Sequence, residues 1–135
     1  MEEKEELSRQ PISRVLISVS DKSGIVDLSR KMSEMGIEII STGGTSKKIS
    51  ESGVSVRPVE EVTNFPEMMD GRVKTLHPLI FGGILGRDSD KEQMKAHNID
   101  KIDMVICNLY PFKAAADQGV DLYSLIEEID IGCLL

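Results

Sequence analysis

Aromatic residues are scarce in this 135-residue chain: tryptophan is absent, and aromatics make up only 4% of the residues. An aromatic-rich β-sandwich core is therefore not expected, and Ile, Val, Leu and Met must fill the interior. Hydrophobic residues account for 40% of the chain and charged residues for 29%. This length and balance favour one globular domain with one ordinary core, and the chain is too short for two.

Cysteine and positive charge are also in short supply. Cys107 and Cys133 lack both a disulfide framework and the spacing of metal ligands, so we expect reduced thiols in a cytoplasmic protein and no metal site. The formal net charge of -7 disfavours a nucleic-acid or anionic-membrane surface, because both need a basic face. No apolar run approaches the ~20 residues that span a bilayer, and the first residues do not form a signal peptide. We expect neither nucleic acid nor membrane as a partner, whereas an anionic small molecule fits if cations gather locally.

Short apolar runs and glycine-containing joints organise the chain from residue 14 onward, and residues 1–13 are expected to form a flexible N-terminal extension. The alternation predicts an α/β fold, a parallel sheet with helices on both faces, whose ligand crevice lies beyond the carboxyl ends of the strands. In the first helix, Ile25, Leu28 and Met32 are expected on the buried face, with Met35 one turn further. Strands are predicted at 15–19, 37–40, 54–59, 79–85 and 102–109, and helices at 24–35, before 52–53, 88–97 and 122–129, with 60–78 irregular except for a turn at 66–69.

Two strand-to-helix loops carry phosphate-type donors. Ser18, Ser20 and Lys22 surround the end of the first strand, where hydroxyls, free backbone N–H groups and a helix dipole converge. The loop Ser41-Thr42-Gly43-Gly44-Thr45 repeats the arrangement after the second strand, with glycines that let the backbone approach an oxygen-rich ligand. Helix capping or a tight turn explains either loop alone, and neither matches the Walker or GxGxxG pattern. Because both loops open at one sheet edge, together they favour a phosphate site.

A basic loop, residues 71–78, holds Arg72 and Lys74 two positions apart, so in an extended segment both side chains project to one side. Arginine offers a planar fork for phosphate, whereas the pKa of a lysine falls readily on desolvation, which makes Lys74 the better candidate for proton transfer. A solvated basic loop explains the same pattern without a ligand. His77, before Pro78, is typical of a hydrogen-bonded loop histidine.

Three further polar residues lie near predicted element ends. Asn108 and Tyr110 close the last clear strand, where an amide and a phenol could read the edge of a heterocycle or donate to a developing oxyanion. A strand-terminating turn with a core-facing tyrosine fits them equally well. Asp130 follows an apolar helix and, on its pattern alone, is a residue of a C-terminal turn.

Taken in order, five strings of this sequence resemble the signatures of the IMP cyclohydrolase domain, the N-terminal domain of bifunctional purine-biosynthesis enzymes. They are VSDK at 19–22, STGGT at 41–45, GRVKTLHP at 71–78, CNLYPF at 107–112 and IDIG at 129–132. The similarity spans about residues 14–132. It implies a methylglyoxal-synthase-like α/β fold, a homodimer, and closure of 5-formamidoimidazole-4-carboxamide ribotide to inosine monophosphate with loss of water. No metal or organic cofactor is implied.

The resemblance also assigns roles to individual residues. Lys74, Tyr110 and Asp130 match the positions that transfer protons, while Asn108 and Asp130 approach the base of the purine nucleotide. After residue 132 the family continues with a second glycine and a helix bearing another basic residue, where this chain ends in Cys133-Leu134-Leu135. We therefore expect residues 14–135 to form an incomplete domain without folate-dependent transformylase activity. The resemblance further implies that the phosphate of the substrate is held by the positions matching Ser20, Lys22, Ser41, Gly43, Gly44, Thr45, Arg72 and Thr75.

Two alternatives share the same fold. A nucleotide-sensing module, like the effector-binding domain of large carbamoyl-phosphate synthetases, would bind nucleotide without turnover. A methylglyoxal synthase should carry several aspartates near the phosphate loops, and Asp21 has no convincing companion there. The cyclohydrolase reading leads, and turnover separates it from the sensing module.

Overall fold

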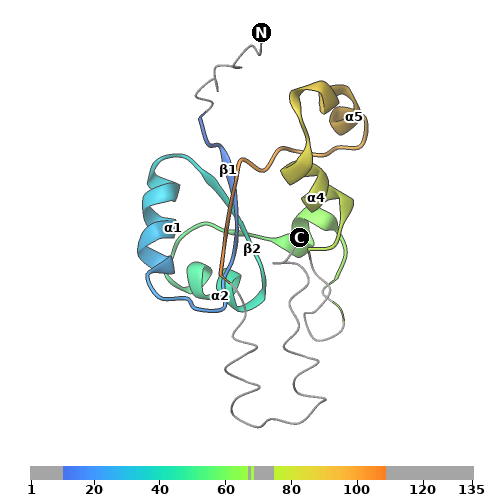
Figure 1. The fold of residues 1–135 in the computed structure, drawn as a ribbon. Helices are drawn as coiled ribbons and strands as arrows, with labels where there is room; N and C mark the ends of the chain where they lie inside the picture. Colours follow the sequence, from blue (N-terminus) through green and yellow to red (C-terminus); the bar gives the residue numbers. More distant parts are fainter. Residues whose placement is uncertain (1–10, 67, 69–74, 109–135) are drawn as a thin grey trace.

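Four parallel strands form the sheet in the computed structural model, which describes residues 11–66, 68 and 75–108. They are β1 (Arg14–Ser18), β2 (Glu38–Ser41), β3 (Arg57–Pro58) and β4 (Met104–Cys107), in the spatial order β3-β2-β1-β4. Every neighbouring pair is parallel (Figure 1). The α/β class with a parallel sheet, expected from the alternating pattern, is confirmed.

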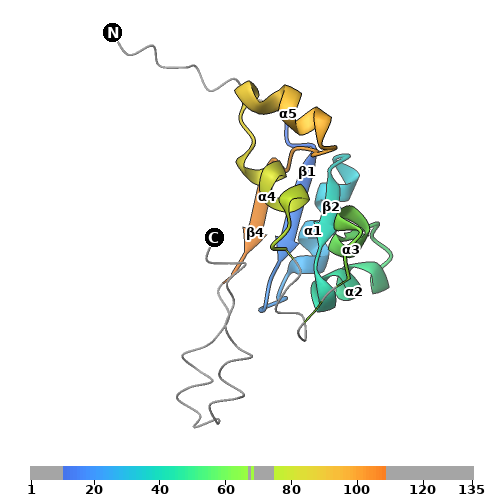
Figure 2. The ribbon, with the colours of Figure 1, turned by 90° about the vertical axis from the view of Figure 1, so that its right-hand side faces the viewer.

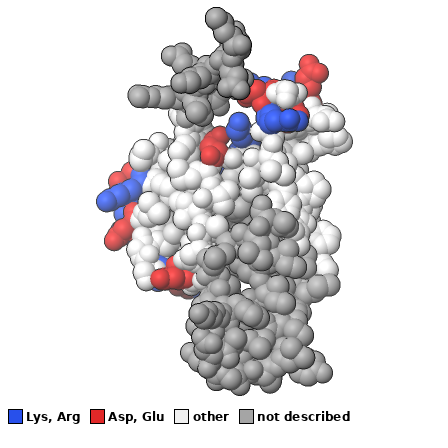
Figure 3. Space-filling view, viewed as in Figure 1, with Lys and Arg blue, Asp and Glu red and all other residues white. Residues whose placement is uncertain are grey.

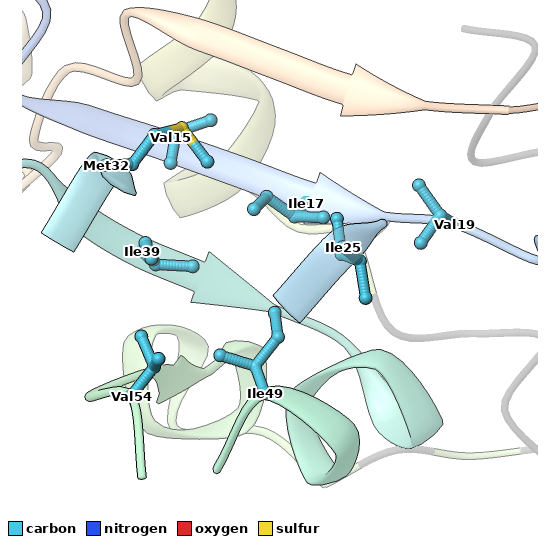
Figure 4. Close-up of a cluster of buried hydrophobic side chains, with 8 residues drawn as sticks. All are labelled: Val15, Ile17, Val19, Ile25, Met32, Ile39, Ile49 and Val54. Carbon is cyan, nitrogen blue, oxygen red and sulfur yellow. The ribbon is translucent and has the colours of Figure 1, made fainter. Parts of the chain in front are cut away.

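Helices cover both faces of this sheet. Side chains alternate between the two faces along β1, and apolar residues of β1 point to each of them. Val15 and Ile17 point to the face covered by α1 (Ile25–Glu34) and α2 (Gly43–Glu51), as the cluster in Figure 4 shows. Leu16 lies in a second cluster, on the opposite face, with residues of α3 (Val59–Thr63) and α4 (Pro78–Leu85). Two further helical segments, η1 (Asp88–Asp90) and α5 (Lys91–Ala96), lie beyond the end of the sheet where the strands begin (Figures 1 and 2).

The strand predicted at 79–85 is wrong, because this segment is the helix α4. Pro78 occupies the first turn, where its missing N–H costs nothing, and the Nδ1 atom of His77 accepts the N–H of Leu79 at 3.1 Å. Gly83 lets this helix approach the segment of the chain that precedes β4: a Cβ at Gly83 would lie 2.6 Å from the carbonyl oxygen of Asp100. A short apolar run fits either a strand or a helix. His77 and Pro78, at the start of this run, favour the helix.

The buried face of α1 also differs from the expected one. Ile25 and Met32 are buried as expected, but Leu28 is 41% exposed and Met35 is 76% exposed. Ser29 takes the inner position instead and is fully buried. Positions 25, 29 and 32 lie on one stripe of the helix, and this stripe faces the core. Ser29 is therefore buried because of its position on the helix, although its side chain is polar.

The hydroxyl of Ser29 is buried, and no residue of the described part of the chain forms a hydrogen bond with it. Such a group loses its contacts with water and gains nothing in return, which costs about 1–3 kcal/mol. We therefore expect Ser29→Ala to raise the free energy of unfolding by about 1 kcal/mol, measured by urea denaturation. Ser50→Ala, an exposed change on α2, is the control and should have little effect. A clear loss of stability in Ser29→Ala would show that the hydroxyl is satisfied in solution.

Several predicted boundaries moved. The extended piece at 54–59 shrinks to the two residues of β3, and α3 occupies the start of the stretch expected to be irregular. The helix predicted at 24–35 begins one residue later, because Gly24, at φ 73°, is the N-cap of α1. The polar helix at 88–97 is split into η1 and α5. Residues 67 and 69 of the turn predicted at 66–69, the helix predicted at 122–129 and residues 1–10 of the predicted extension lie outside the described residues.

Charged side chains are unevenly spread over the face drawn in Figure 3. They gather over α1 and around α5, whereas the described surface between these elements, over α4, is mostly uncharged. At the amino ends of the strands, Arg14 joins Glu38 at 3.0 Å, and Arg57 joins the same carboxylate at 3.5 Å. In the part of the chain that is described, no helix is long and apolar enough to cross a membrane.

Candidate functional site

The carboxyl ends of β1, β2 and β4 meet at one edge of the sheet, at the bottom of Figure 1. The pairing register sets this: Ile17 lies opposite Ser41, and Ser18 lies opposite Cys107. The loops that follow the three strands therefore start at nearly the same level, as parallel strands require. The predicted site residues that the structure brings to this edge are Ser18, Ser20, Lys22, Ser41, Gly43, Gly44, Thr45 and Asn108.

Hydroxyl groups link the loops that follow β1 and β2 through hydrogen bonds. The Ser41 hydroxyl donates to the carbonyl oxygen of Ile17 at 2.7 Å, and the Thr45 hydroxyl donates to that of Val19 at 3.1 Å. Ser18 and Thr42 share a hydrogen bond of 3.0 Å between their hydroxyl oxygens. The hydroxyl hydrogens of Ser41 and Thr45 thus hold α2 and β2 against β1, and donors for an anion must come from elsewhere at this edge.

Those donors lie at the first turn of α2. The turn holds no acidic residue, and the side chain of its N-cap, Thr42, makes no capping hydrogen bond. The first backbone N–H groups of a helix have no partner within it, and those of Gly43, Gly44 and Thr45 form no hydrogen bond elsewhere in the described ranges, so they remain for an external acceptor. Gly43 has φ 35°, a conformation that glycine adopts far more readily than other residues. The chain direction therefore turns sharply from β2 into a helix whose amino end is uncapped.

A lysine ammonium lies beside this helix end. A Cβ placed on Gly44 would be 3.5 Å from Cε of Lys22 and 3.9 Å from Nζ. The ammonium donates to the carbonyl oxygens of Val19 at 3.1 Å and Ser20 at 3.4 Å, which leaves capacity for a third acceptor. Cations are ordinarily disfavoured at a helix N-terminus, where the partial charge is positive. The pairing of Lys22 with the amino end of α2 is therefore suited to an anion that binds both.

The turn that carries Lys22 is held from two sides. Ser23 donates through its hydroxyl to Asp21 at 2.7 Å and through its backbone N–H at 3.0 Å. These two hydrogen bonds lower the pKa of Asp21 from its ordinary value near 3.8, and Lys48 adds a smaller lowering. Asn108, which directly follows β4, binds the same turn: its Oδ1 accepts the backbone N–H of Ser20 at 2.7 Å. Asp21 is thus a structural carboxylate of the turn.

Thr75 and His77 are described, and neither joins this group. The carbonyl oxygen of Thr75 accepts the N–H of His77 at 2.8 Å, and within the described ranges Thr75 makes no hydrogen bond to the two loops. His77 is a helix-capping residue, in agreement with the hydrogen-bonded loop histidine that was expected. Arg72, Lys74, Tyr110 and Asp130 lie outside the described residues, so their roles stay predictions.

Two features of the edge were missed from sequence. The hydrogen bond between Thr42 and Ser18 was not anticipated, although a hydroxyl at each strand end was a usable signal. The contact of Lys22 with the first turn of α2 depends on how two loops fold back, which sequence spacing does not encode. Over residues 11–66, 68 and 75–108, no group of three or more His, Cys, Asp or Glu side chains is placed to hold a metal.

A parallel sheet with helices on both faces, whose strand-to-helix loops gather at its carboxyl edge, defines a domain of the α/β class. The model of a known family, described as the MGS-like domain, matches residues 24–135, and the chain belongs to this family. This confirms the family that the five sequence strings indicated.

Individual relatives agree with this assignment. The bifunctional purine biosynthesis protein PurH of Cereibacter sphaeroides is 54% identical over 125 residues, which are 90% of this chain and 24% of that protein, in its N-terminal region. PurH of Paracoccus denitrificans is 54% identical over 127 residues, covering 92% of this chain and 24% of its own length. The chain thus spans about a quarter of these relatives. A solved structure titled "Crystal structure of ForH" superposes with a TM-score of 0.66 at 31% identity, over 74% of this chain and 54% of that one.

Proposed function

We propose that this chain acts in purine biosynthesis as an IMP cyclohydrolase, closing the ring of 5-formamidoimidazole-4-carboxamide ribotide to give inosine monophosphate. The observation that carries the proposal is the Lys22 ammonium placed beside the uncapped amino end of α2, two positive groups that suit one bound phosphate. The 54% identity to proteins named for purine biosynthesis supports a purine ribotide as the ligand that carries this phosphate.

The chemistry of ring closure suits a site of this kind. The carboxamide nitrogen attacks the formyl carbon of the same molecule, a new C–N bond forms, and water leaves. Because both reacting groups belong to one substrate, anchoring its phosphate and holding a reactive rotamer supply much of the acceleration. Proton transfers remain, and we assign them to Lys74, Tyr110 and Asp130 on the resemblance of their strings to the family. The scheme needs no metal and no organic cofactor.

Removing the ammonium should weaken phosphate binding strongly. We expect Lys22→Ala to lower the affinity for inosine monophosphate by about 1.5–3 kcal/mol, the scale for a hydrogen bond to a charged group, measured by isothermal titration calorimetry. Lys47→Ala is the matched control, since it removes the same charge from an exposed side chain of α2. Equal affinities of the two variants would contradict the proposed phosphate pocket. Arg72→Ala should weaken binding on the same scale if its guanidinium reaches the phosphate.

The proposed function itself is tested by turnover. A spectrophotometric assay of inosine monophosphate formation from the formamido ribotide should show ring closure, alongside calorimetric binding of the product. Binding without turnover would favour a nucleotide-sensing module of the same fold. Absence of both would contradict the proposal. We further propose a cytoplasmic homodimer, and sedimentation velocity tests the dimer.

A further inference from the structure

The side chain of Asn108 binds the dipeptide Ser20–Asp21 with both ends of its carboxamide. Its Oδ1 accepts hydrogen bonds from the backbone N–H of Ser20 at 2.7 Å, the hydroxyl of Ser20 at 2.9 Å and the backbone N–H of Asp21 at 3.3 Å. Its Nδ2 donates to the carbonyl oxygen of Asp21 at 2.9 Å. The acceptor faces three donors and the donor faces an acceptor, so the reverse orientation of the amide would be opposed on both sides.

These bonds join segments that are far apart in sequence. Asn108 follows β4 at the edge of the described sheet, whereas Ser20 and Asp21 follow β1, 88 and 87 positions earlier. The two strands are neighbours and end at the same level. The asparagine therefore fixes the turn after β1 to a rigid element, which is how a sheet holds a loop in one conformation.

The fixed turn carries the cation of the phosphate site. The peptide between Ser20 and Asp21 donates its N–H to Asn108, while the carbonyl oxygen of Ser20, on the same peptide, accepts from Lys22 at 3.4 Å. The orientation of this one peptide group thus links the carboxamide to the ammonium. Lys22 then reaches the first turn of α2 beside Gly44.

We propose that Asn108 is a positioning residue of the phosphate subsite, which holds the Ser20–Asp21 turn so that the Lys22 ammonium stays beside the amino end of α2. This differs from a role in contacting the purine base, which the family resemblance implied. The inference rests on the proposed function only in taking a phosphate-bearing ribotide as the ligand. Its effect on binding passes through Lys22, and it should extend to any sugar phosphate that uses this subsite.

The test compares a ligand with a base and a ligand without one. Affinities for inosine monophosphate and for ribose 5-phosphate are measured for the wild-type chain, Asn108→Ala, Lys22→Ala and the double variant. We expect Asn108→Ala to weaken both ligands by roughly 10-fold, and to weaken them by less than about 2-fold once Lys22 is already alanine, because coupled neighbours are not additive. Asn98→Gly, which removes an exposed carboxamide at a position with φ 56°, is the control and should leave both affinities unchanged.

A loss of affinity for inosine monophosphate alone would assign Asn108 to the base and overturn the proposal, as would additive effects of the two substitutions. If Asn108→Ala does not fold, Asn108→Asp keeps the acceptor oxygen and removes only the donor to Asp21. A purely electrostatic effect of its new charge would add to that of Lys22→Ala, whereas a positioning effect would not. Binding of ribose 5-phosphate without any ring closure would refute the proposed reaction while the affinities still decide the role of Asn108. Binding of neither ligand would overturn both.

Discussion

Ring closure by a Lys74→Arg variant is expected to be about 10²- to 10⁴-fold slower than in the parent chain, the usual contribution of general acid–base catalysis. Arginine keeps the positive charge of lysine but stays protonated in proteins, so it can hold a phosphate and cannot take up a proton. Binding of inosine monophosphate should therefore be nearly unchanged. The measurement is the turnover rate of both proteins at saturating formamido ribotide, together with the affinity for the product.

Tyr110→Phe is the companion variant, because it removes only the phenolic hydroxyl, and a fall of the same order is expected. Both comparisons take the parent's own rate of ring closure as the reference. Near-normal turnover of Lys74→Arg would make Lys74 a phosphate ligand and assign the proton transfer to another residue.

The second large effect concerns the core beneath the site. Ile25→Ala should lower the free energy of unfolding by about 2–5 kcal/mol, because Ile25 is 4% exposed and packs in the cluster with Ile17 and Val19. Leu28→Ala removes as many carbon atoms from the same helix, where Leu28 is 41% exposed, and should cost no more than about 1 kcal/mol. Urea denaturation of the pair gives the comparison. Equal losses would show that α1 presents the face expected from sequence, with Leu28 inward.

That pair also shows where sequence reasoning stopped short. The strands from Arg14 to Ser18 and from Met104 to Cys107 were predictable, because short β-branched and apolar runs between polar loops suit a sheet buried on both faces. The inner face of α1 was not, since Leu28 is the more hydrophobic choice and Ser29 the better placed one. Hydrophobicity indicates that a helix is buried on one side, and the phase of its contacts depends on what packs against it.

The candidate site divides in a similar way. The meeting of the first two loops at one sheet edge followed from the parallel topology alone, and Lys22 and Gly44 do lie together there. The hydrogen-bond partners of individual side chains could not be predicted from the topology. Ser41 and Thr45 were expected to bind phosphate, but their hydroxyls donate to carbonyl oxygens of the first strand and of the loop that follows it. Such bonds depend on distances between segments about 25 residues apart, which no local pattern contains.

We propose above that the phosphate of a purine nucleotide binds between Lys22 and the amino end of α2. Amide chemical-shift mapping tests it directly, with inosine monophosphate in one titration and inosine, which lacks the phosphate, in the other. The account predicts that the nucleotide shifts the amide signals of Gly43, Gly44 and Thr45, and that inosine at the same concentration leaves them nearly unchanged. Equal shifts from both ligands would contradict it, as would shifts confined to the open groove between α4 and α5, lined by Leu85 and Met94.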